Sequence, residues 1–563
     1  MKEDNGANGA NEMIFLPIGG VEEIGMNVSM YGYGTPGKRK WLVVDLGITF
    51  PDAQKAPGID LMFPDISFLK KEQANIVGIV ITHAHEDHFG ALLDLWSEIP
   101  VPVYMTKFAA ELLRAKAEEE HHPPEINVKV FKAGDSISLS PFTVEAIEVA
   151  HSIPESVALA ISSPLGTVVH TGDWKLGPSP LLGESTNLPR LREIGDDGVL
   201  ALVCDSTNIT QAGRSRTSCE LTECLTSLVE EASGRVAVTT FASNVERIKI
   251  MAEIAKKTGR KIVVLGRAMK RSIKVASGLG MLDGVQEFLY EEAYNTIPRD
   301  KIIALMTGSQ GEERAALSVI STKGHKRVSF SAGDTVIFSS HTIPGNEDKV
   351  SSVINRLADQ DVHVITDQDV PLVHVSGHPK CDEIKEMYEA VRPKILIPVH
   401  GEPLHIKAHT EFACRHGIPE VVRCRNGTIA RLAPGKAEAI DSVFVGRFFK
   451  DGRLLISSSD DCVGERQKLS VVGVVTVGVV LNRKGNLLVE PNVVLRGIPS
   501  ADAEGDSFEE ICLDAVIITV DSLPAVHSRD SESVSSSVKR AVEGAVARRW
   551  GKKPVVDVMV SIV

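Results

Sequence analysis

The chain has 563 residues, of which 43% are hydrophobic and 24% are charged, and its formal net charge is −13 at pH 7. This length exceeds what one hydrophobic core usually organises, so we expect several domains. No charge-free apolar stretch is long enough to span a bilayer, and the polar N-terminus lacks an apolar signal region. We therefore expect a cytoplasmic protein without membrane contact, with a disordered tail at residues 1–12. The negative charge disfavours non-specific attachment to nucleic acid but allows a locally basic groove.

Short apolar strands, turns and helices alternate along most of the chain. The sequence predicts strands at 14–17, 27–30, 41–45, 76–81, 101–105, 128–131 and 142–149, and helices at 91–96 and 107–119. This pattern is typical of an α/β layered domain. A second α/β unit has its clearest elements at 235–240, 245–258, 261–265 and 301–306. We interpret it as an insertion, because residues of metal-ligand type resume only after it, at His374 and His400.

We divide the chain into domains on this basis. The layered domain occupies 13–214 and 371–450, the inserted α/β unit 215–370, a linker 451–466, and a small α+β C-terminal domain 467–563. The linker is predicted from the polar run at 457–461. The C-terminal domain is predicted from a strand at 470–481, a helix at 534–550 and a strand at 555–563.

The segment His83-Ala84-His85-Glu86-Asp87-His88 directly follows the apolar strand at 76–81. Extended backbone points His83 and His85 the same way, whereas Asp87 and His88 fall on the following turn, so the segment can address two metal ions. A surface patch of polar residues is the alternative. Imidazole and carboxylate are, however, the ligands that borderline divalent ions select.

Three further residues of ligand type, His151, Asp173 and His400, each follow an apolar strand. α/β proteins place their sites at the carboxyl ends of strands. Each of the three alone is more often a hydrogen-bonded histidine or a turn aspartate. Together they complete two sites, with Asp173 bridging: one ion takes His83, His85 and His151, and the other takes Asp87, His88 and His400. The expected cofactors are two divalent metal ions per chain, zinc or, as the alternative, manganese.

These motifs carry a resemblance to a known fold. His83-x-His85-x-Asp87-His88, with Asp45, His151 and Asp173, resembles the motif series of the metallo-β-lactamase fold, which is an αββα sandwich. In that fold Asp45 would hold the metal-binding histidines by hydrogen bonds. Lactamases, thioesterases, lipid hydrolases and nucleases all use such a cluster, so the fold alone does not choose a substrate.

The inserted unit narrows the choice of substrate. Motifs in this unit and in the segments that flank it are similar, one after another, to those of the β-CASP nucleases, and among these most similar to the ribonuclease J family, from Met13 to the C-terminus. They lie at 205–208, 240–244, 266–269, 307–312, 343–347, 374–378 and 398–402. The resemblance implies that the β-CASP motif residues are Asp205, Glu220, His378 and His400, of which Glu220 rests on the looser context Ser218-Cys219-Glu220. A histidine at position 400 resembles the RNA-processing branch.

The resemblance implies a metal-dependent ribonuclease acting in RNA maturation and mRNA decay. It would degrade single-stranded RNA from 5′ to 3′, with internal cleavage as a further activity, by a two-metal hydroxide attack on the phosphodiester. The catalytic residues would be Asp87, Asp205 and His378. His378 is our general acid for the leaving 3′-oxygen, since an imidazole titrates near neutral pH. Its alternative role is to cap a turn after Gly377.

The same resemblance implies a pocket for a 5′-terminal monophosphate. Its residues are Ser243, Asn244, His374, Val375, Ser376, Gly377 and His378. Hydroxyls and an imidazole beside small residues let backbone N–H groups approach an anion, although Ser-Asn and Ser-Gly pairs also favour plain turns. The expected partners are single-stranded RNA with a 5′-monophosphate, further copies of this chain in a dimer or tetramer formed through the C-terminal domain, and proteins of an RNA-degradation complex.

Two basic groups have less specific interpretations. Arg267, Lys270, Arg271 and Lys274 are spaced along a predicted helix and either line the RNA path or form a solvated helix face. Arg548, Arg549, Lys552 and Lys553 fit a charge cluster at a helix C-terminus. Two other functions stay open. One is a catalytically silent RNA-binding or scaffold protein, which the intact ligand set disfavours. The other is a hydrolase of a small ester, which needs no second domain over its site.

Overall fold

The computed structural model describes residues 10–52, 55–177, 181–343, 345–524 and 526–563. It divides into two compact units, Met1–Thr49 with Met62–Phe448 and Phe50–Leu61 with Phe449–Val563. The tail predicted at residues 1–12 lies outside the described residues up to position 9, and the first strand already begins at Glu12. No helix among the described residues is long and apolar enough to cross a membrane.

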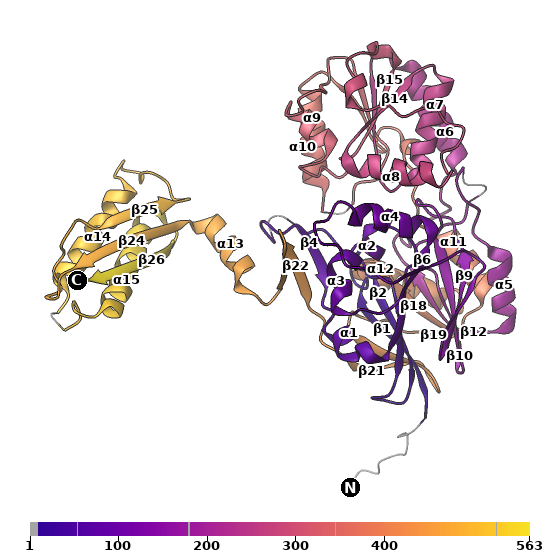
Figure 1. Cartoon of the computed structure of the whole chain (residues 1–563), viewed down its shortest axis with the longest axis horizontal. Coiled ribbons are helices and arrows are strands. Elements are labelled where there is room, and N and C mark those ends of the chain that lie inside the picture. Colours follow the sequence, from indigo (N-terminus) through magenta and orange to yellow (C-terminus); the bar gives the residue numbers. More distant parts are fainter. Residues whose placement is uncertain (1–9, 53–54, 178–180, 344, 525) are drawn as a thin grey trace, which may run out of the picture. The chain divides into compact units, whose positions relative to one another are not determined.

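Two β-sheets packed face to face form the centre of the larger unit (Figure 1). One has the strand order β21-β20-β1-β2-β3-β5-β6-β7 and the other β19-β18-β12-β11-β10-β9-β8. The strands of the first sheet are β1 (Glu12–Gly19), β2 (Val28–Gly34), β3 (Lys40–Val44), β5 (Ile76–Val80), β6 (Val103–Thr106), β7 (Val128–Phe131), β20 (Thr428–Ala433) and β21 (Glu438–Ser442). Those of the second are β8 (Ser136–Leu139), β9 (Phe142–Glu148), β10 (Val157–Ser163), β11 (Gly166–His170), β12 (Val199–Asp205), β18 (Ile395–Val399) and β19 (Glu420–Val421).

Helices cover the outer faces of both sheets. Alternate side chains of the two sheets share one core, which includes Phe15 and Ile397, both fully buried. The helices are α1 (Ser67–Glu72), α2 (Glu86–Phe89), α3 (Leu92–Leu95), α4 (Lys107–Ala117), α5 (Leu188–Asp197), α11 (Cys381–Val391) and α12 (Pro403–Arg415). α4 lies against β6 and β7 of the first sheet, and α5, α11 and α12 pack on the second. The predicted αββα sandwich is confirmed.

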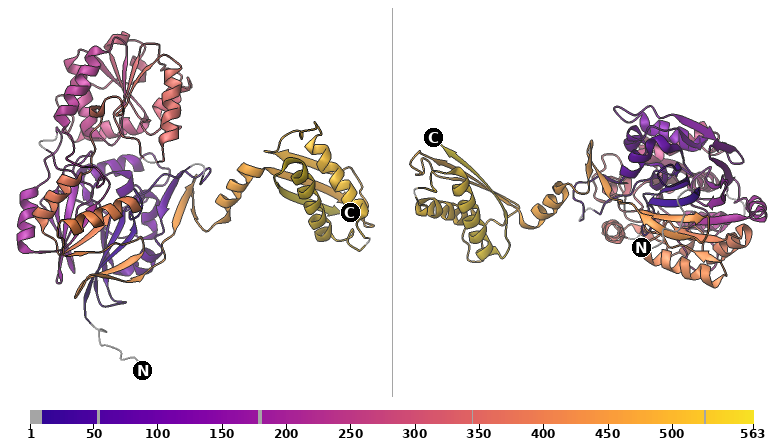
Figure 2. Two further views of the ribbon diagram at one scale, coloured as in Figure 1. Left: turned by 180° about the vertical axis from the view of Figure 1, so that it is seen from behind. Right: turned by 90° about the horizontal axis from the view of Figure 1, so that it is seen from below.

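The inserted unit is built on a parallel sheet with the order β14-β15-β13-β16-β17. Its strands are β13 (Val236–Thr239), β14 (Lys261–Leu265), β15 (Ile302–Met306), β16 (Thr335–Phe338) and β17 (His363–Ile365). Its helices are α6 (Ser218–Glu231), α7 (Val245–Lys257), α8 (Arg267–Gly278), α9 (Ala316–Ser321) and α10 (Glu347–Ala358). α9 and α10 lie on one side of the sheet and α6 and α7 on the other, as both views show (Figure 2). The insertion separates β12 from β18, which are neighbours in the sandwich.

The smaller unit contains a sheet with the order β25-β24-β26, covered by two helices on one face. Its elements are α13 (Asp461–Val472), β24 (Val474–Leu481), β25 (Asn492–Arg496), α14 (Phe508–Ser522), α15 (Ser531–Trp550) and β26 (Val555–Ile562). The remaining strands of the chain are β4 (Leu61–Pro64), β22 (Arg447–Asp451) and β23 (Leu454–Ser457).

The segment predicted as a linker, 451–466, contains β23 and the first half of α13. Asp460 in its polar run accepts a hydrogen bond from the Cys462 N–H and caps that helix. The strand predicted from residue 470 starts only at Val474, after α13 has ended. Neither β25 nor α14 was predicted. α14 is apolar over most of its length and lacks the polar face that identifies a helix in a sequence.

Candidate metal centre

The predicted metal-ligand residues come together at one edge of the sandwich. His83 and His85 follow β5, Asp87 and His88 lie on α2, and His151 and Asp173 follow β9 and β11. His400 follows β18. Among the described residues, three groups have ligand atoms that all lie within 4.8 Å of one another: His83, His85, His151 and Asp173; Asp87, His88, Asp173 and His400; and Asp173, Asp205, His378 and His400. The first two groups correspond to the two sets that the sequence predicted, with Asp173 common to both.

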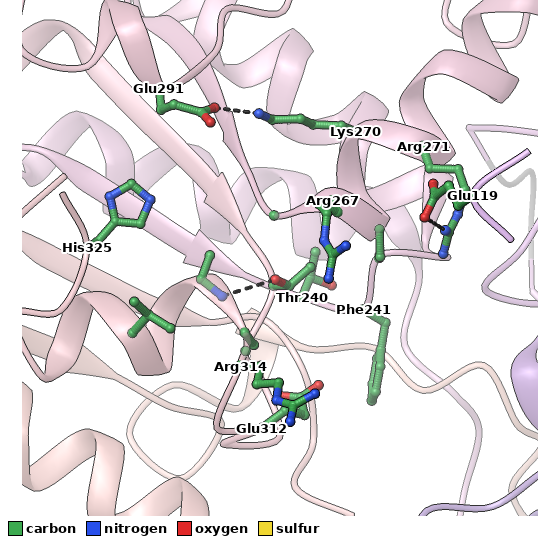
Figure 3. A pocket seen from close by; sticks show the side chains of 18 residues that line it. Glu119, Thr240, Phe241, Arg267, Lys270, Arg271, Glu291, Glu312, Arg314 and His325 are labelled. Carbon is green, nitrogen blue, oxygen red and sulfur yellow. Dashed lines mark hydrogen bonds and ion pairs between the residues drawn. The ribbon is translucent and has the colours of Figure 1, made fainter. Parts of the chain in front are cut away.

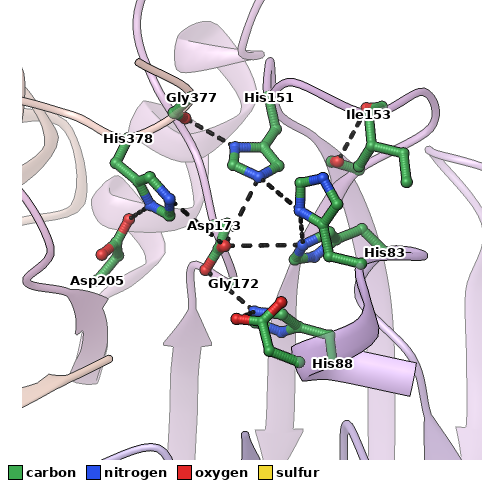
Figure 4. A network of polar contacts seen from close by, with 12 residues as sticks. His83, His88, His151, Ile153, Gly172, Asp173, Asp205, Gly377 and His378 are labelled. Carbon is green, nitrogen blue, oxygen red and sulfur yellow. Dashed lines mark hydrogen bonds and ion pairs between the residues drawn. The ribbon is translucent and has the colours of Figure 1, made fainter. Parts of the chain in front are cut away.

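In the first group, three imidazole nitrogens converge beside one carboxylate (Figure 4). His85 Nδ1 is 3.1 Å from His83 Nε2 and 3.1 Å from His151 Nε2. Asp173 Oδ2 is 3.7 Å from His83 Nε2 and 3.6 Å from His151 Nε2. Burial lowers the pKa of all three histidines, that of His85 to about 4. Neutral imidazoles are the form that binds a metal ion.

The second group is richer in carboxylates. Asp173 Oδ1 is 3.3 Å from His88 Nε2, and Asp87 Oδ2 is 3.3 Å from His400 Nε2. Burial lowers the pKa of His400, but Asp173, Asp87 and Asp205 outweigh it and raise the pKa to about 10. Asp173 Oδ1 and His400 Nε2 are buried, and among the described residues neither has a hydrogen-bond partner of suitable geometry. A cation at this place would satisfy both atoms, so the residues fit two divalent ions.

Hydrogen bonds on the far side of the rings hold these ligands in place. Asp45 accepts hydrogen bonds from His88 Nδ1 (2.7 Å) and from the N–H and hydroxyl of Thr82. The Thr82 hydroxyl is also 3.0 Å from His83 Nδ1, and His151 Nδ1 donates to the Gly377 carbonyl at 2.7 Å. Each bond leaves the Nε2 lone pair directed into the cluster. Asp45 and His400 both have positive φ (64° and 51°), which is uncommon outside glycine and is typical of functional sites.

Sequence reasoning missed two residues of this site. Asn27 donates through Nδ2 to the Asp87 carbonyl (3.1 Å) and lies 3.0 Å from His88 Nε2. At Gly47 a Cβ atom would lie 1.7 Å from the same carbonyl, so only glycine fits. Asn27 was assigned to a strand and Gly47 lies just beyond the predicted strand at 41–45, and nothing in the local sequence connects either of them with residue 87.

A proton-donor candidate faces the cluster from the loop before α11. His378 Nδ1 donates to Asp205 Oδ2 at 2.8 Å, and its Nε2 is 3.9 Å from Asp173 Oδ2. Asp205 also accepts hydrogen bonds from the N–H and hydroxyl of Thr207. Burial lowers the pKa of His378, but Asp205 and Asp173 raise it more, so that the net shift is upward. His378 Nε2 faces the cluster, on the side of the ring away from Asp205.

A buried Ser-His pair lies behind Asp205. Ser206 Oγ is 2.8 Å from His409 Nδ1, and both side chains are fully buried. Ser206 also joins the metal centre, because its N–H donates to the His400 carbonyl. The sequence analysis did not single out His409, since a lone histidine within a helix is an ordinary feature.

The residues predicted for a terminal phosphate lie on two segments. Ser376 Oγ accepts hydrogen bonds from Asn208 Nδ2 (2.8 Å) and from the His378 N–H (3.1 Å), and Val375 and Gly377 are buried beside it. His374 is mostly buried, its Nδ1 has no partner among the described residues, and burial lowers its pKa to about 3.

Ser243 and Asn244 precede α7 on the second segment, and Asn244 caps that helix. Arg247 connects the two segments by donating to the Val373 carbonyl at 3.3 Å.

Other predicted residues take structural roles. Glu220 forms a capping box with Thr217 at the start of α6 and is not part of the cluster. Arg549 pairs with the loop carboxylates Asp502 and Glu504, and Lys553 pairs with Glu543, as expected for a charge cluster near the end of α15.

Profiles of four known domains match the chain. They are "Metallo-beta-lactamase superfamily" at residues 26–200, "Ribonuclease J, beta-CASP domain" at 233–357, "Zn-dependent metallo-hydrolase RNA specificity domain" at 370–419 and "Ribonuclease J C-terminal domain" at 461–563. Together with the sandwich and its ligand cluster, these matches define a metal-dependent hydrolase of the metallo-β-lactamase superfamily that carries a β-CASP domain.

The relatives narrow this class further. Ribonuclease J of Sinorhizobium meliloti is 50% identical over 98% of this chain and 97% of its own length, and that of Mycobacterium tuberculosis is 35% identical over 96% and 95%. A crystal structure of a protein of unknown function from Enterococcus faecalis V583 is 16% identical with a TM-score of 0.52, over 75% of this chain and 100% of that one, and shares the fold. The chain belongs to the ribonuclease J family, and it is a metal-dependent ribonuclease.

Proposed function

We propose that this enzyme degrades single-stranded RNA from its 5′ end in the 5′-to-3′ direction, and that the same centre also cleaves internally. The observation that carries the proposal is the position of His378. Its Nε2 faces Asp173, which is common to the two ligand groups, and its N–H bonds to Ser376 of the candidate phosphate pocket. A proton donor, a metal centre and a phosphate-binding loop are therefore adjacent.

His83, His85, His151 and Asp173 would hold one ion, and Asp87, His88, Asp173 and His400 the other. We propose zinc for both, since five of the seven ligand residues are histidines and imidazole suits zinc better than manganese. When bound, the two ions supply an activated water and neutralise charge on the phosphoryl oxygens. Asp45, Thr82 and the Gly377 carbonyl fix the ligand rings before the substrate arrives.

His378 gives its Nε2 proton to the 3′-oxygen as the bond from phosphorus to that oxygen breaks. The oxygen of water remains on the phosphorus, so the products carry a 5′-phosphate and a 3′-hydroxyl. Asp205 supports this role, because it accepts the Nδ1 proton at 2.8 Å and stabilises the charged ring before transfer. Thr207 fixes Asp205 in turn.

We propose that a 5′-terminal monophosphate is held by Ser243, Asn244, His374 and Ser376, with backbone N–H groups of the 374–378 loop. His374 Nδ1 supports this assignment, because it is buried and has no hydrogen-bond partner among the described residues, and a terminal phosphate would supply one. A triphosphate brings extra charge and bulk that so small a set of donors cannot pair.

We further propose that the C-terminal unit joins copies of this chain into a dimer or tetramer. One face of its sheet packs on α14 and α15, while the other exposes Val494 (41%) and Met559 (63%). Val494 is the register partner of Thr476 and Met559 that of Gly478, so both lie on this open face. Size measurement by light scattering on Met559→Asp tests this, since a charge there should favour the monomer. We also propose that the enzyme acts in the cytoplasm, in RNA maturation and mRNA decay.

One assay tests the direction of degradation. RNA of one sequence, labelled at the 5′ end or at the 3′ end, is incubated with the metal-loaded enzyme and with chelator. Early release of a labelled mononucleotide from the 5′-labelled RNA, with a 3′ label retained on long products, is the expected result. Release from the 3′ end would overturn the direction. Absence of cleavage with metal would favour a silent RNA-binding protein, and hydrolysis of small esters only would favour the remaining alternative.

A further inference from the structure

A cavity of about 580 Å³ lies at the carboxyl edge of the parallel sheet in the inserted unit (Figure 3). It is lined by residues that follow β13, β14 and β15, and by Glu119 just beyond α4 of the sandwich. None of the metal-ligand candidates is among the described lining residues. Open α/β sheets bind ligands outside this edge, so the cavity has the position of a binding site.

Two glycines bring the backbone close to this cavity. Gly266 has φ +105°, and a Cβ there would lie 2.5 Å from Thr307 Oγ1; Gly308 has φ +117°, and a Cβ there would lie 2.7 Å from Leu317 Cβ. Gly266 is also the N-cap of α8 and has no side chain to cap it. The first N–H groups of α8 are therefore left for another acceptor.

The positive charge at the cavity is concentrated on two arginines. Three of the basic residues predicted along α8 are neutralised: Lys270 pairs with Glu291 (2.5 Å), Arg271 with Glu119 (2.8 Å) and Lys274 with Glu118 (3.8 Å). Arg267 and Arg314 both line the cavity and are exposed, and no hydrogen bond or ion pair joins either guanidinium to the described residues. An unpaired guanidinium is suited to bind phosphate.

An aromatic ring, and its closeness in sequence to the proposed phosphate pocket, indicate which kind of ligand the cavity binds. Phe241, partly exposed, lines the same cavity, in a chain with only 5% aromatic residues. Ser243 and Asn244 of the proposed phosphate pocket lie two and three residues further along the chain. Guanidinium groups for phosphates and a ring for a base are the combination that holds single-stranded nucleic acid without reading its sequence.

We propose that this cavity is a distal subsite for the RNA strand, in which Arg267 and Arg314 bind backbone phosphates and Phe241 stacks on a base. The inference rests on the proposed action on single-stranded RNA. A free nucleotide carries the same phosphate and base, so the experiment must distinguish the strand from a mononucleotide.

The test measures binding of fluorescently labelled, 5′-monophosphorylated single-stranded RNA to the full chain in excess chelator, which prevents cleavage, at several salt concentrations. The variant Arg267→Ala with Arg314→Ala should weaken binding by about 10-fold at low salt. It should also reduce the slope of log K against log salt by about 1.4, since each lost phosphate contact on a single strand accounts for about 0.7.

Phe241→Ala should weaken binding by about 5-fold or more and leave the salt slope unchanged, because stacking releases no counterions. Lys274→Ala is the matched control. Lys274 lies on the same helix but is 77% exposed and does not line the cavity, so affinity and slope should stay as in the unmodified enzyme.

Two outcomes would overturn the proposal. Unchanged RNA affinity and slope in the double arginine variant would remove the cavity from the strand's path. Loss of binding of a labelled nucleoside 5′-monophosphate in that variant, with RNA binding intact, would make the cavity a mononucleotide site. Both binding measurements are independent of cleavage. If the end-labelled assay contradicts the proposed direction of degradation, the binding result still stands. If the binding test excludes the cavity from the path of the RNA, the proposed direction of degradation still stands.

Discussion

The metal-ligand cluster and the 374–378 loop touch each other, yet they are organised in opposite ways. In the cluster, hydrogen bonds fix the outer nitrogens of the rings, while Asp173 Oδ1 and His400 Nε2 face inward and have no hydrogen-bond partner of suitable geometry among the described residues. In the loop, the Ser376 hydroxyl is already bonded to Asn208 and to the His378 N–H. The cluster is thus incomplete without cations, whereas most of the loop is satisfied by the protein itself.

Enzyme activity should therefore respond more strongly to substitutions in the metal-ligand cluster than to substitutions in the 374–378 loop. A ligand lost from the cluster removes a group that nothing else can replace. A hydroxyl lost from the loop removes one of several donors, and the backbone remains. Effects on activity should therefore decrease from the cluster, through His378 between the two regions, to the phosphate loop and finally to the residues behind them.

The largest effect is expected at Asp173, which belongs to every ligand group of the centre. Asp173→Asn should reduce RNA cleavage to the background seen with chelator, because both ions lose a charged ligand. Metal analysis should give fewer than two ions per chain. Asp196, on α5, forms an exposed ion pair with Arg392 at the end of α11. Asp196→Asn is the matched control and should keep full activity. Two bound ions and normal cleavage in the Asp173 variant would contradict the assignment.

His378→Ala should lower the single-turnover rate by roughly 10²–10⁴-fold, the usual contribution of a positioned acid, with two ions still bound. His363→Ala, at an exposed histidine on β17, controls for the loss of an imidazole as such. Loss of metal from the His378 variant would instead show that this residue is a metal ligand. Its Nε2 lies 3.9 Å from Asp173 Oδ2, close enough for that alternative to need this test.

The difference between the two regions also explains what could be predicted from the sequence. The cluster was predictable because its ligands end apolar strands, and the edge of a layered sheet brings strand ends together. Asn27 and Gly47 were not, because their role depends on a contact with a segment forty or more residues away. The same limit applies to α8. Spacing identified four basic residues there, but only the tertiary contacts separate the unpaired Arg267 from Lys270 and Arg271, which are in ion pairs.

For the fold, too, local sequence patterns could be predicted and features without such a pattern could not. The sandwich and the α/β character of the inserted unit were predicted, because strands and helices alternate clearly along both. In the C-terminal unit α14 was missed, since its apolar face and its outer face both carry aliphatic residues. The first half of α13 was not predicted as a helix, because its N-terminal cap has the composition of a loop.

A smaller effect is expected at the phosphate loop. Ser376→Ala with His374→Ala should lower kcat/KM for 5′-monophosphorylated RNA by about 10- to 100-fold, as expected for two bonds to a charged group. The weaker activity on 5′-triphosphorylated RNA should change little, so the preference for the monophosphate narrows. A circular RNA of the same sequence has no end and serves as the control, since its cleavage should be nearly unaffected. Equal degradation rates of 5′-monophosphorylated and 5′-triphosphorylated RNA by the unmodified enzyme would show that these residues only form a turn.

The smallest effect on catalysis, but a distinct effect on stability, is expected at His409. This imidazole is fully buried against Ser206, and burial lowers its pKa to about 4, compared with about 6.5 in an unfolded chain. Between pH 4 and 6.5 the unfolded state therefore binds a proton that the folded state does not, and stability must fall as the pH falls through this window. The loss amounts to about 3 kcal/mol at pH 4.

His409→Gln loses the packing against Tyr388, so this variant should be less stable than the unmodified chain at pH 7.5. Because glutamine cannot take up the proton, the variant should lose less stability on acidification. Urea unfolding midpoints at pH 7.5, 5.5 and 4.5, in excess chelator so that metal release does not contribute, measure this difference. His363→Gln, at an exposed site, should follow the unmodified chain at every pH. Parallel pH profiles for all three proteins would mean that His409 is not held neutral behind Asp205.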